Sequence, residues 1–202
     1  MGLETISSRT GFLLAGGKSS RMGTDKAFLQ FRGKPLLENT LAVMRRACSS
    51  VTIVGDPAEF GAYGGVVADV FAGCGPLAGI HAGLKSSSSE LNFFLAVDMP
   101  YVSAELIALL LGVAAQSDAV VVVPRTTRGL QPLCAVYRRS FAAVAEGALR
   151  ARKYKVDAAF AGLPIRVVDE AELVRHGFSE HDFFNVNTPE DLRLAEDSTK
   201  RP

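Results

Sequence analysis

A short segment near the start of the chain combines glycines with cations. Glycine lets the backbone turn tightly and point several N–H groups the same way, and N–H groups beside cations form a cradle for phosphate. The alternative is a solvated turn whose charges only confer solubility. So many glycines and cations directly after an apolar run favour the anion site. The residues are Gly16, Gly17 and Gly23, with Lys18, Arg21 and Lys26.

Two familiar phosphate motifs do not account for this segment. Gly17-Lys-Ser resembles the end of a P-loop, but the glycine that a P-loop requires five residues earlier is Phe12 here. The dinucleotide fingerprint G-x-G-x-x-G also fails, because Gly16 and Gly17 are adjacent. The segment therefore predicts a different kind of nucleotide loop.

Asp98 is the carboxylate best suited to metal chemistry. It follows the apolar run 93–97, which would otherwise be too buried to tolerate a charge. A carboxylate at the carboxyl end of a central strand, facing a phosphate loop, is a natural Mg²⁺ ligand. Its alternative role is to cap the next helix, although Ser103 is better placed for that. Asp69 follows another apolar run, and there a plain loop acid is an equally good interpretation.

Three further groups of residues are candidates. The glycine-rich segment 73–79 predicts a tight loop before a helix N-terminus, which suits an anion but equally suits close helix–sheet packing. Asn185 and Asn187 alternate along an extended segment, so both should point to one side, either to a site or into a turn. The basic cluster after residue 149 is either a solvated face or a patch for a phosphate. It consists of Arg150, Arg152, Lys153 and Lys155.

The elements that must position these residues alternate between short apolar runs and longer amphipathic segments. This alternation predicts βαβ units and a mostly parallel sheet covered on both faces, a three-layer Rossmann-like α/β fold. Ligands of such sheets bind at the carboxyl ends of the strands, which selects the loops after Leu14, Val54, Ala68 and Val97. The expected strands are 12–15, 51–54, 65–68, 93–97, 119–123, 133–137 and 165–168, and segment 183–186 is expected to be extended. The expected helices are 35–47, 77–84, 103–115, 140–150 and one that starts at Thr188.

The composition limits the class of protein. The chain has 202 residues, 48% hydrophobic and 21% charged, which suits a single domain, 1–202, with its core at about 11–195. The net charge of +1 argues against a nucleic-acid binder, and the longest apolar run, 106–115, is about half a membrane span. The three cysteines lack CxxC spacing and predict thiols in a reducing compartment; they are Cys48, Cys74 and Cys134. We therefore expect a cytoplasmic protein with no membrane or nucleic-acid partner.

The segment LAGGKSSRMGTDK at 14–26 resembles the signature loop of nucleotidyltransferases that make nucleoside-diphosphate conjugates from NTPs. From about Gly11 to Ala195 the chain looks like the molybdenum cofactor guanylyltransferase family. The doubled glycine, where cytidylyl relatives usually carry Ala-Gly, and the NVNTP segment at 185–189 narrow the resemblance to the guanylyl branch. The supporting segments occur in family order: GKPL at 33–36, GPLAG at 75–79, VDMP at 97–100, QPL at 131–133 and FNVNTP at 184–189.

The resemblance implies a nucleotidyltransferase fold and an Mg²⁺-dependent transfer of GMP from GTP to Mo-molybdopterin, with release of pyrophosphate. It implies that three residues are catalytic: Arg21 and Lys26 hold the triphosphate, and Asp98 binds the metal. The nucleotide-binding positions that it implies are Leu14, Ala15, Gly16, Gly17, Lys26, Asp69, Gly79 and Asp98. Candidates for binding the pterin substrate are Arg152, Lys153, Asn185 and Asn187. Cofactor-biosynthesis proteins and apo-molybdoenzymes are the further partners that such a product implies.

Other functions remain open at this point. The same chemistry could use CTP or a sugar phosphate, and a non-catalytic nucleotide-binding module could keep the fold. The presence of Arg21, Lys26 and Asp98 together speaks against pure binding, which needs no metal carboxylate. Relatives often carry an Asn just after the second strand, near the guanine, whereas this chain has Gly55-Asp56. The base contact there, and with it part of the choice of GTP over CTP, stays open.

Overall fold

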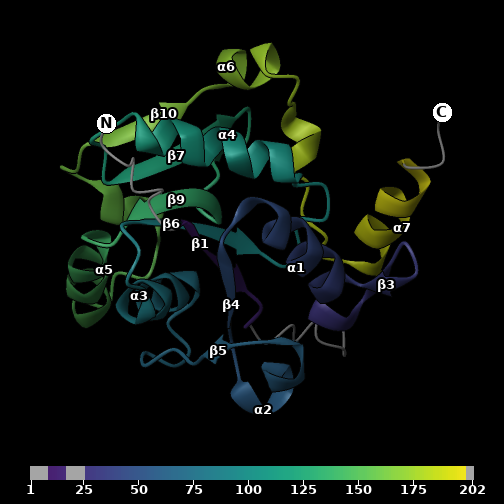
Figure 1. Ribbon diagram of the computed structural model, residues 1–202, viewed down its shortest axis with the longest axis horizontal. Helices are drawn as coiled ribbons and strands as arrows, with labels where there is room; N and C mark the ends of the chain where they lie inside the picture. The colour runs from purple at the N-terminus through teal and green to yellow at the C-terminus, as the bar shows by residue number, and fades with distance from the viewer. Residues whose placement is uncertain (1–8, 17–25, 199–202) are drawn as a thin grey trace, which may run out of the picture.

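The computed structural model describes residues 9–16 and 26–198, which build one large sheet flanked by helices (Figure 1). The strand order is β10-β7-β9-β6-β1-β4-β5, with β8 paired to β7. Neighbours are parallel except that β9 runs antiparallel to β6 and β7, and β8 antiparallel to β7. The strands are β1 (Arg9–Leu14), β4 (Ser50–Val54), β5 (Val66–Val67), β6 (Leu91–Ala96), β7 (Val121–Thr126), β8 (Gly129–Leu130), β9 (Cys134–Arg138) and β10 (Ile165–Val168).

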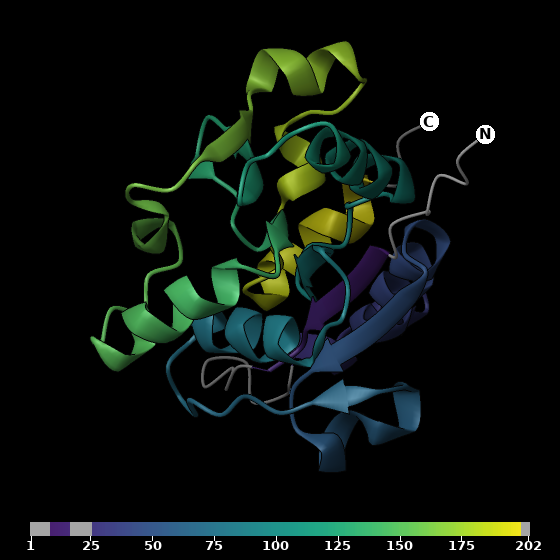
Figure 2. The same ribbon diagram turned by 60° about the vertical axis from the view of Figure 1, so that its left-hand side comes forward.

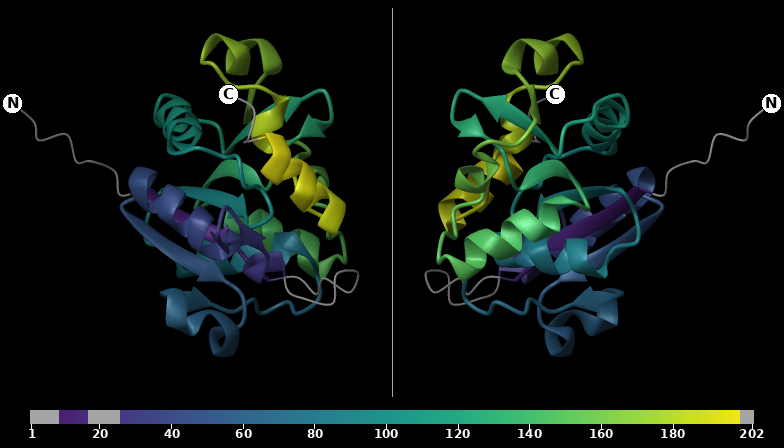
Figure 3. Two further views of the ribbon diagram at one scale, coloured as in Figure 1. Left: turned by 90° about the vertical axis from the view of Figure 1, so that its right-hand side faces the viewer. Right: turned by 90° about the vertical axis from the view of Figure 1, so that its left-hand side faces the viewer.

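Helices cover both faces of the sheet, as Figures 2 and 3 show from two further sides. Residues of α1 (Leu36–Ala47) and α4 (Ala104–Ala115) share a core with one face. Residues of α3 (Pro76–Ser86) and α5 (Phe141–Arg150) share a second core with the other face. This arrangement confirms the predicted three-layer α/β fold with a mostly parallel sheet. The remaining helices are α2 (Pro57–Phe60), α6 (Glu170–Arg175) and α7 (Pro189–Ser198).

The central strands supply side chains to both cores. All six residues of β6 are buried, because a strand covered on both faces needs an apolar side chain at almost every position. Leu13 of β1 packs toward α1 and α4, whereas Phe12 stacks on Phe94 at 4.9 Å on the other side. Gly83 of α3 lets that helix lie close to the two rings, since a Cβ there would come within 2.8 Å of Phe94. The two cores fix the sheet from which the functional loops extend.

Most predicted elements are present with bounds shifted by one to three residues, and three details differ. Pro35 is the N-cap of α1 instead of its first helical residue. The expected loop between β7 and β9 contains β8, because Gly129 adopts a φ of +106° and returns the chain onto β7. Segment 183–186 begins with the end of a 3₁₀ helix, Glu180–Phe183, which a capping box between Ser179 and Asp182 starts. The other short elements are β2 (Gln30–Phe31), β3 (Lys34–Pro35) and the 3₁₀ turns Lys26–Phe28, Gly61–Tyr63 and Asp157–Phe160.

The three cysteines are free, as expected for thiols outside a disulfide framework. Cys48 and Cys134 are buried, and burial raises the pKa of both thiols, that of Cys48 to about 12. Such thiols stay protonated and unreactive at neutral pH. Across the ranges that the structure describes, every helix is too short or too polar to cross a bilayer.

Candidate functional site

The site lies where β1, β4 and β6 end side by side. The backbone N–H groups of Ala15 and Gly16 both donate to the carbonyl of Val54 at 3.1 Å. The N–H of Val97 donates to the carbonyl of Leu14, also at 3.1 Å. The start of the glycine-rich segment is therefore held between β4 and β6. Because these two N–H groups are used within the fold, the predicted phosphate cradle cannot use the Gly16 N–H.

Lys26, Asp98 and Asn187 converge at this edge of the sheet. The Lys26 ammonium donates to Asp98 Oδ2 at 3.1 Å and to Asn187 Oδ1 at 2.7 Å. The side chains of Lys26 and Asp98 are 23% and 18% exposed, so both are shielded yet open to a ligand. An ion pair of this exposure contributes about 0–1 kcal/mol to stability. A phosphate or a metal ion can therefore replace it at small cost.

The start of α7 places Asn187 in this cluster. The carboxylate of Asp191 accepts from the N–H groups of Asn187 and Thr188, at 2.9 and 2.8 Å, and Thr188 Oγ1 accepts from the N–H of Asp191 at 3.1 Å. This reciprocal cap confirms the helix start predicted at Thr188. The N–H of Val186, which is buried, donates to the backbone carbonyl of Asp98 at 2.8 Å. The segment before α7 is thus attached directly to the loop after β6.

The cap also sets the charge of Asp191. Partial burial by itself raises the pKa of that carboxyl, but the hydrogen bonds from Asn187 and Thr188 outweigh it and lower the pKa below its ordinary value. Asp191 therefore stays ionised at neutral pH. Asn185 behaves differently from Asn187, since its amide donates to the carbonyl of Phe183 at 3.2 Å. Only Asn187, of these two, contacts the charged cluster within the described residues.

Asp98 fits one kind of metal site. Magnesium in nucleotide sites is held by one or two carboxylates together with substrate phosphates, not by a cage made of protein groups alone. In the described parts of the chain, no group of three or more His, Cys, Asp and Glu side chains lies together. A single carboxylate beside a lysine and an amide, at the end of a central strand, matches the first arrangement. Asp98 would hold such an ion, with the Asn187 amide oxygen adjacent.

The other predicted site residues have different surroundings. Gly17 and Arg21 lie outside the described residues. Asp69 is exposed after β5. Gly79 is buried in α3, where an added Cβ would lie 3.0 Å from Leu14 Cδ2 and 3.2 Å from Val54 Cγ1. Gly79 therefore packs against the last residues of β1 and β4. Its proposed effect on the nucleotide would pass through Leu14.

The basic cluster lies at the end of α5. Arg152 and Lys153 are exposed. Arg152 has a φ of +57°, and the N–H groups of Arg152 and Lys153 donate to the carbonyls of Leu149 and Ala148, both within 3.0 Å. This is a Schellman motif with an arginine where glycine is usual. This strained position was not predictable from the sequence, because an arginine does not mark a helix end.

Packing explains why this chain has Gly55-Asp56 where relatives often carry an asparagine. A Cβ on Gly55 would come within 2.6 Å of the Phe60 ring, so the close approach of α2 requires glycine. Asp56 caps α2, where its carboxylate accepts from the N–H of Ala58 at 2.8 Å. Neither residue offers the free amide that the relatives' asparagine would bring to a base.

Solved structures place this fold among the nucleotidyltransferases. The chain superposes with a TM-score of 0.84 on a molybdopterin-guanine dinucleotide biosynthesis protein A from Archaeoglobus fulgidus, at 26% identity, over 96% of this chain and 100% of that one. It shares its fold, at a TM-score of 0.72 and 18% identity, with a 4-diphosphocytidyl-2C-methyl-D-erythritol synthase from Anaerococcus prevotii, over 96% and 97% of the two chains. The fold is therefore the one predicted, a nucleotidyltransferase fold.

Sequence comparison narrows the class to a family. The model of the MobA-like NTP transferase domain matches residues 11–163. A molybdenum cofactor guanylyltransferase from Desulfosudis oleivorans is 34% identical over 95% of this chain and 96% of its own length. A "Probable molybdenum cofactor guanylyltransferase" from Pelotomaculum thermopropionicum is 38% identical over 92% of this chain and 91% of its own length. The chain belongs to the MobA-like NTP transferase family, and the predicted resemblance to the molybdenum cofactor guanylyltransferases is confirmed.

Proposed function

We propose that this protein transfers GMP from GTP to Mo-molybdopterin, giving the guanine dinucleotide cofactor and pyrophosphate. The observation that carries the proposal is the convergence of Lys26, Asp98 and Asn187 beside the glycine-rich segment. These groups lie where a triphosphate and a second phosphate would have to meet. A binding module would need no lysine–carboxylate pair exposed at this edge.

The reaction requires a phosphate oxygen of the acceptor to attack the α-phosphorus of GTP. A bond forms between that oxygen and phosphorus, the bond to the β-phosphate oxygen breaks, and pyrophosphate leaves with added negative charge. Mg²⁺, when bound, would supply fixed positive charge at the phosphates. Asp98 would hold it. Lys26 would exchange its contact with Asp98 for phosphate oxygens, while its contact with Asn187 would keep the ammonium oriented.

The nucleotide base should lie against the carbonyl oxygens of Ala15 and Gly16. Guanine presents two neighbouring donors, N1–H and the 2-amino group, whereas cytosine presents one donor beside two acceptors. Acceptor oxygens on the protein therefore support GTP over CTP. Arg21, Gly17, Asp69 and Gly79 remain proposed nucleotide contacts by family resemblance.

The experiment that tests the proposal is incubation of the protein with each of the four NTPs, Mg²⁺ and Mo-molybdopterin, with the pterin product identified by mass. We expect the guanine dinucleotide from GTP and little product from CTP, ATP or UTP. A cytosine dinucleotide as the main product would move the chain to the cytidylyl relatives, and no product from any nucleotide would contradict transfer to this acceptor. Hand-over of the product to apo-molybdoenzymes or other biosynthesis proteins, in the cytoplasm, belongs to the same proposal.

A further inference from the structure

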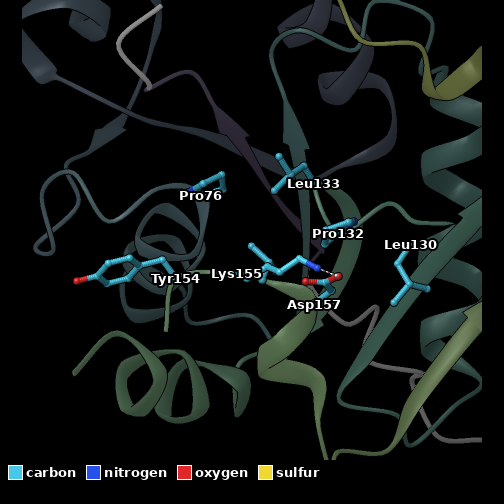
Figure 4. Close-up of a pocket in the computed structure, with 8 residues that line it drawn as sticks. Pro76, Leu130, Pro132, Leu133, Tyr154, Lys155 and Asp157 are labelled. Atoms are coloured by element: carbon cyan, nitrogen blue, oxygen red, sulfur yellow. Dashed lines mark ion pairs between the residues drawn. The ribbon is translucent and has the colours of Figure 1, made fainter. Parts of the chain in front are cut away.

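A pocket of about 280 Å³ opens between the start of α3, the turn before β9 and the chain after α5 (Figure 4). Three segments that are far apart in the chain form it. Pro76 comes from the start of α3, Pro132 and Leu133 come from the turn before β9, and Tyr154, Lys155 and Asp157 come from the chain after α5. The three segments include or adjoin GPLAG at 75–79, QPL at 131–133 and the basic cluster that ends at Lys155.

The pocket lies next to the loop that carries Asp98. The carbonyl of Leu133 accepts from the N–H of Ala96 at 2.9 Å, and Ala96 is two residues before Asp98. The wall at Pro132 is firmly held, because the buried Tyr137 hydroxyl donates to the Pro132 carbonyl at 2.7 Å. A molecule in the pocket could therefore extend an arm to the reacting phosphates while its other end rests on a rigid wall.

The lining combines flat apolar surfaces with one carboxylate. Prolines and leucine form one side, and the ring of Tyr154, 42% exposed, stands on the other side in Figure 4. The Lys155 side chain reaches across to Asp157, whose Oδ2 accepts from its ammonium at 3.1 Å. Asp157 Oδ1 is shielded from water and has no hydrogen-bond partner among the described residues. A shielded carboxylate oxygen without a donor calls for one, and since water does not reach it, the carboxylate or its neighbours must shift before the N–H of a ligand can.

We propose that this pocket binds the pterin ring of the acceptor, with Asp157 as the residue that recognises it; the inference rests on the proposed function. A pterin is a flat heterocycle whose 2-amino group and N3–H form one donor edge, and a carboxylate accepts from both donors with its two oxygens. Lys155 is 79% exposed, and so weak an ion pair gives way easily to the incoming edge. The ring packs between Tyr154 and the prolines.

Guanine carries the same donor edge, so the test must separate the two bases. Binding of 6-hydroxymethylpterin is measured through the fluorescence of the pterin. It is compared with binding of 6-hydroxymethyllumazine, in which an oxygen replaces the 2-amino group. Binding of Mg·GTP is measured by calorimetry in parallel. The variant is Asp157→Asn, which keeps the size but puts a donor against the donor edge. Asp118→Asn, an exposed change in the loop before β7, is the matched control.

We expect the wild type and Asp118→Asn to bind the pterin about tenfold or more tightly than the lumazine. Asp157→Asn should lose that preference, raise the apparent KM for Mo-molybdopterin and leave Mg·GTP affinity unchanged. Equal binding of the two pteridines by the wild type, binding of neither, or unaltered pterin binding by Asp157→Asn would overturn the inference. A loss of GTP affinity in Asp157→Asn would assign the pocket to guanine instead. Failure of the wild type to form any dinucleotide would contradict the proposed function, and that assay is separate from the binding comparison.

Discussion

Lys26 joins the other two residues of the candidate site, since its ammonium contacts both Asp98 and Asn187. Lys26→Ala removes a charge that would stabilise the leaving phosphates, and we expect turnover to fall by roughly 10²–10³. Stability should change by about 1 kcal/mol or less, because the ion pair is partly exposed. Lys85→Ala, an exposed change at the far end of α3, is the control. Product formation at wild-type rate by Lys26→Ala would return the residue to a structural role.

Arg152 occupies a backbone conformation that favours glycine, with a φ of +57°. Arg152→Gly should stabilise the fold by about 0.5–1 kcal/mol, since it relieves the strain at the end of α5. If Arg152 also binds the phosphate of the acceptor, the same change should raise the KM for Mo-molybdopterin while GTP affinity stays constant. Thermal unfolding and steady-state kinetics of one variant measure both effects. A lower melting temperature would contradict the strain argument, and unchanged kinetics would leave the cation as part of a solvated face.

At the scale of elements, the cap of α7 is the device that positions Asn187. Asp191→Ala removes the acceptor of two backbone N–H groups and should cost about 1 kcal/mol of unfolding free energy. It should also lower turnover about tenfold or more, because Asn187 loses its anchor. Asp169→Ala is the control at another helix start: it removes the N-cap of α6, where Asp169 accepts from the N–H of Glu172 at 2.9 Å. An equal stability cost without any difference in turnover between the two variants would contradict the positioning role.

The same cap has a pH dependence whose sign follows from its lowered pKa. A carboxyl that is more acidic in the folded than in the unfolded state stabilises the fold above its unfolded pKa. That stabilisation disappears as pH falls through the folded pKa, which for Asp191 lies below the ordinary aspartate value. Denaturation at a series of pH values should therefore show the Asp191→Ala deficit at neutral pH and its decline in strong acid. A deficit that grows with acidity would contradict the assigned charge.

The elements also show what could be predicted from the sequence. Apolar runs such as β6 and caps such as Ser103, whose Oγ accepts from the N–H of Leu106 at 3.2 Å, are local signals and were predictable. Two-residue strands such as β2 and β8 have too few positions to show a period. The contact between Lys26 and Asn187 joins residues 161 positions apart, and the Asp157 pocket joins three distant segments. Family resemblance placed Lys26, Asp98 and Asn187 in one site, but only the packed sheet shows which side chains meet.

For the whole molecule, both cores are built on the same sheet, so neither can unfold without exposing the other. We therefore expect one cooperative transition, in line with a single domain. Denaturant unfolding followed by far-ultraviolet circular dichroism and by tyrosine fluorescence should give coincident midpoints. Tyr137 is buried between α5 and the sheet, and Tyr101 lies beside the segment that precedes α7, so the fluorescence reports on both faces. Two separated midpoints would show that the faces unfold independently.

Asp98 is the residue that we propose to hold the metal for the transfer, and Asp98→Asn is the decisive test of that role. The change keeps the size and the backbone bond from Val186 but removes the charge that a hard cation prefers. Product formation is measured against Mg²⁺ concentration, with calorimetry of Mg·GTP binding as a second readout. We expect an intact fold, turnover lower by at least roughly 10² and weakened Mg²⁺-dependent GTP binding. An active Asp98→Asn enzyme with the wild-type dependence on Mg²⁺ would contradict the metal role and the mechanism built on it.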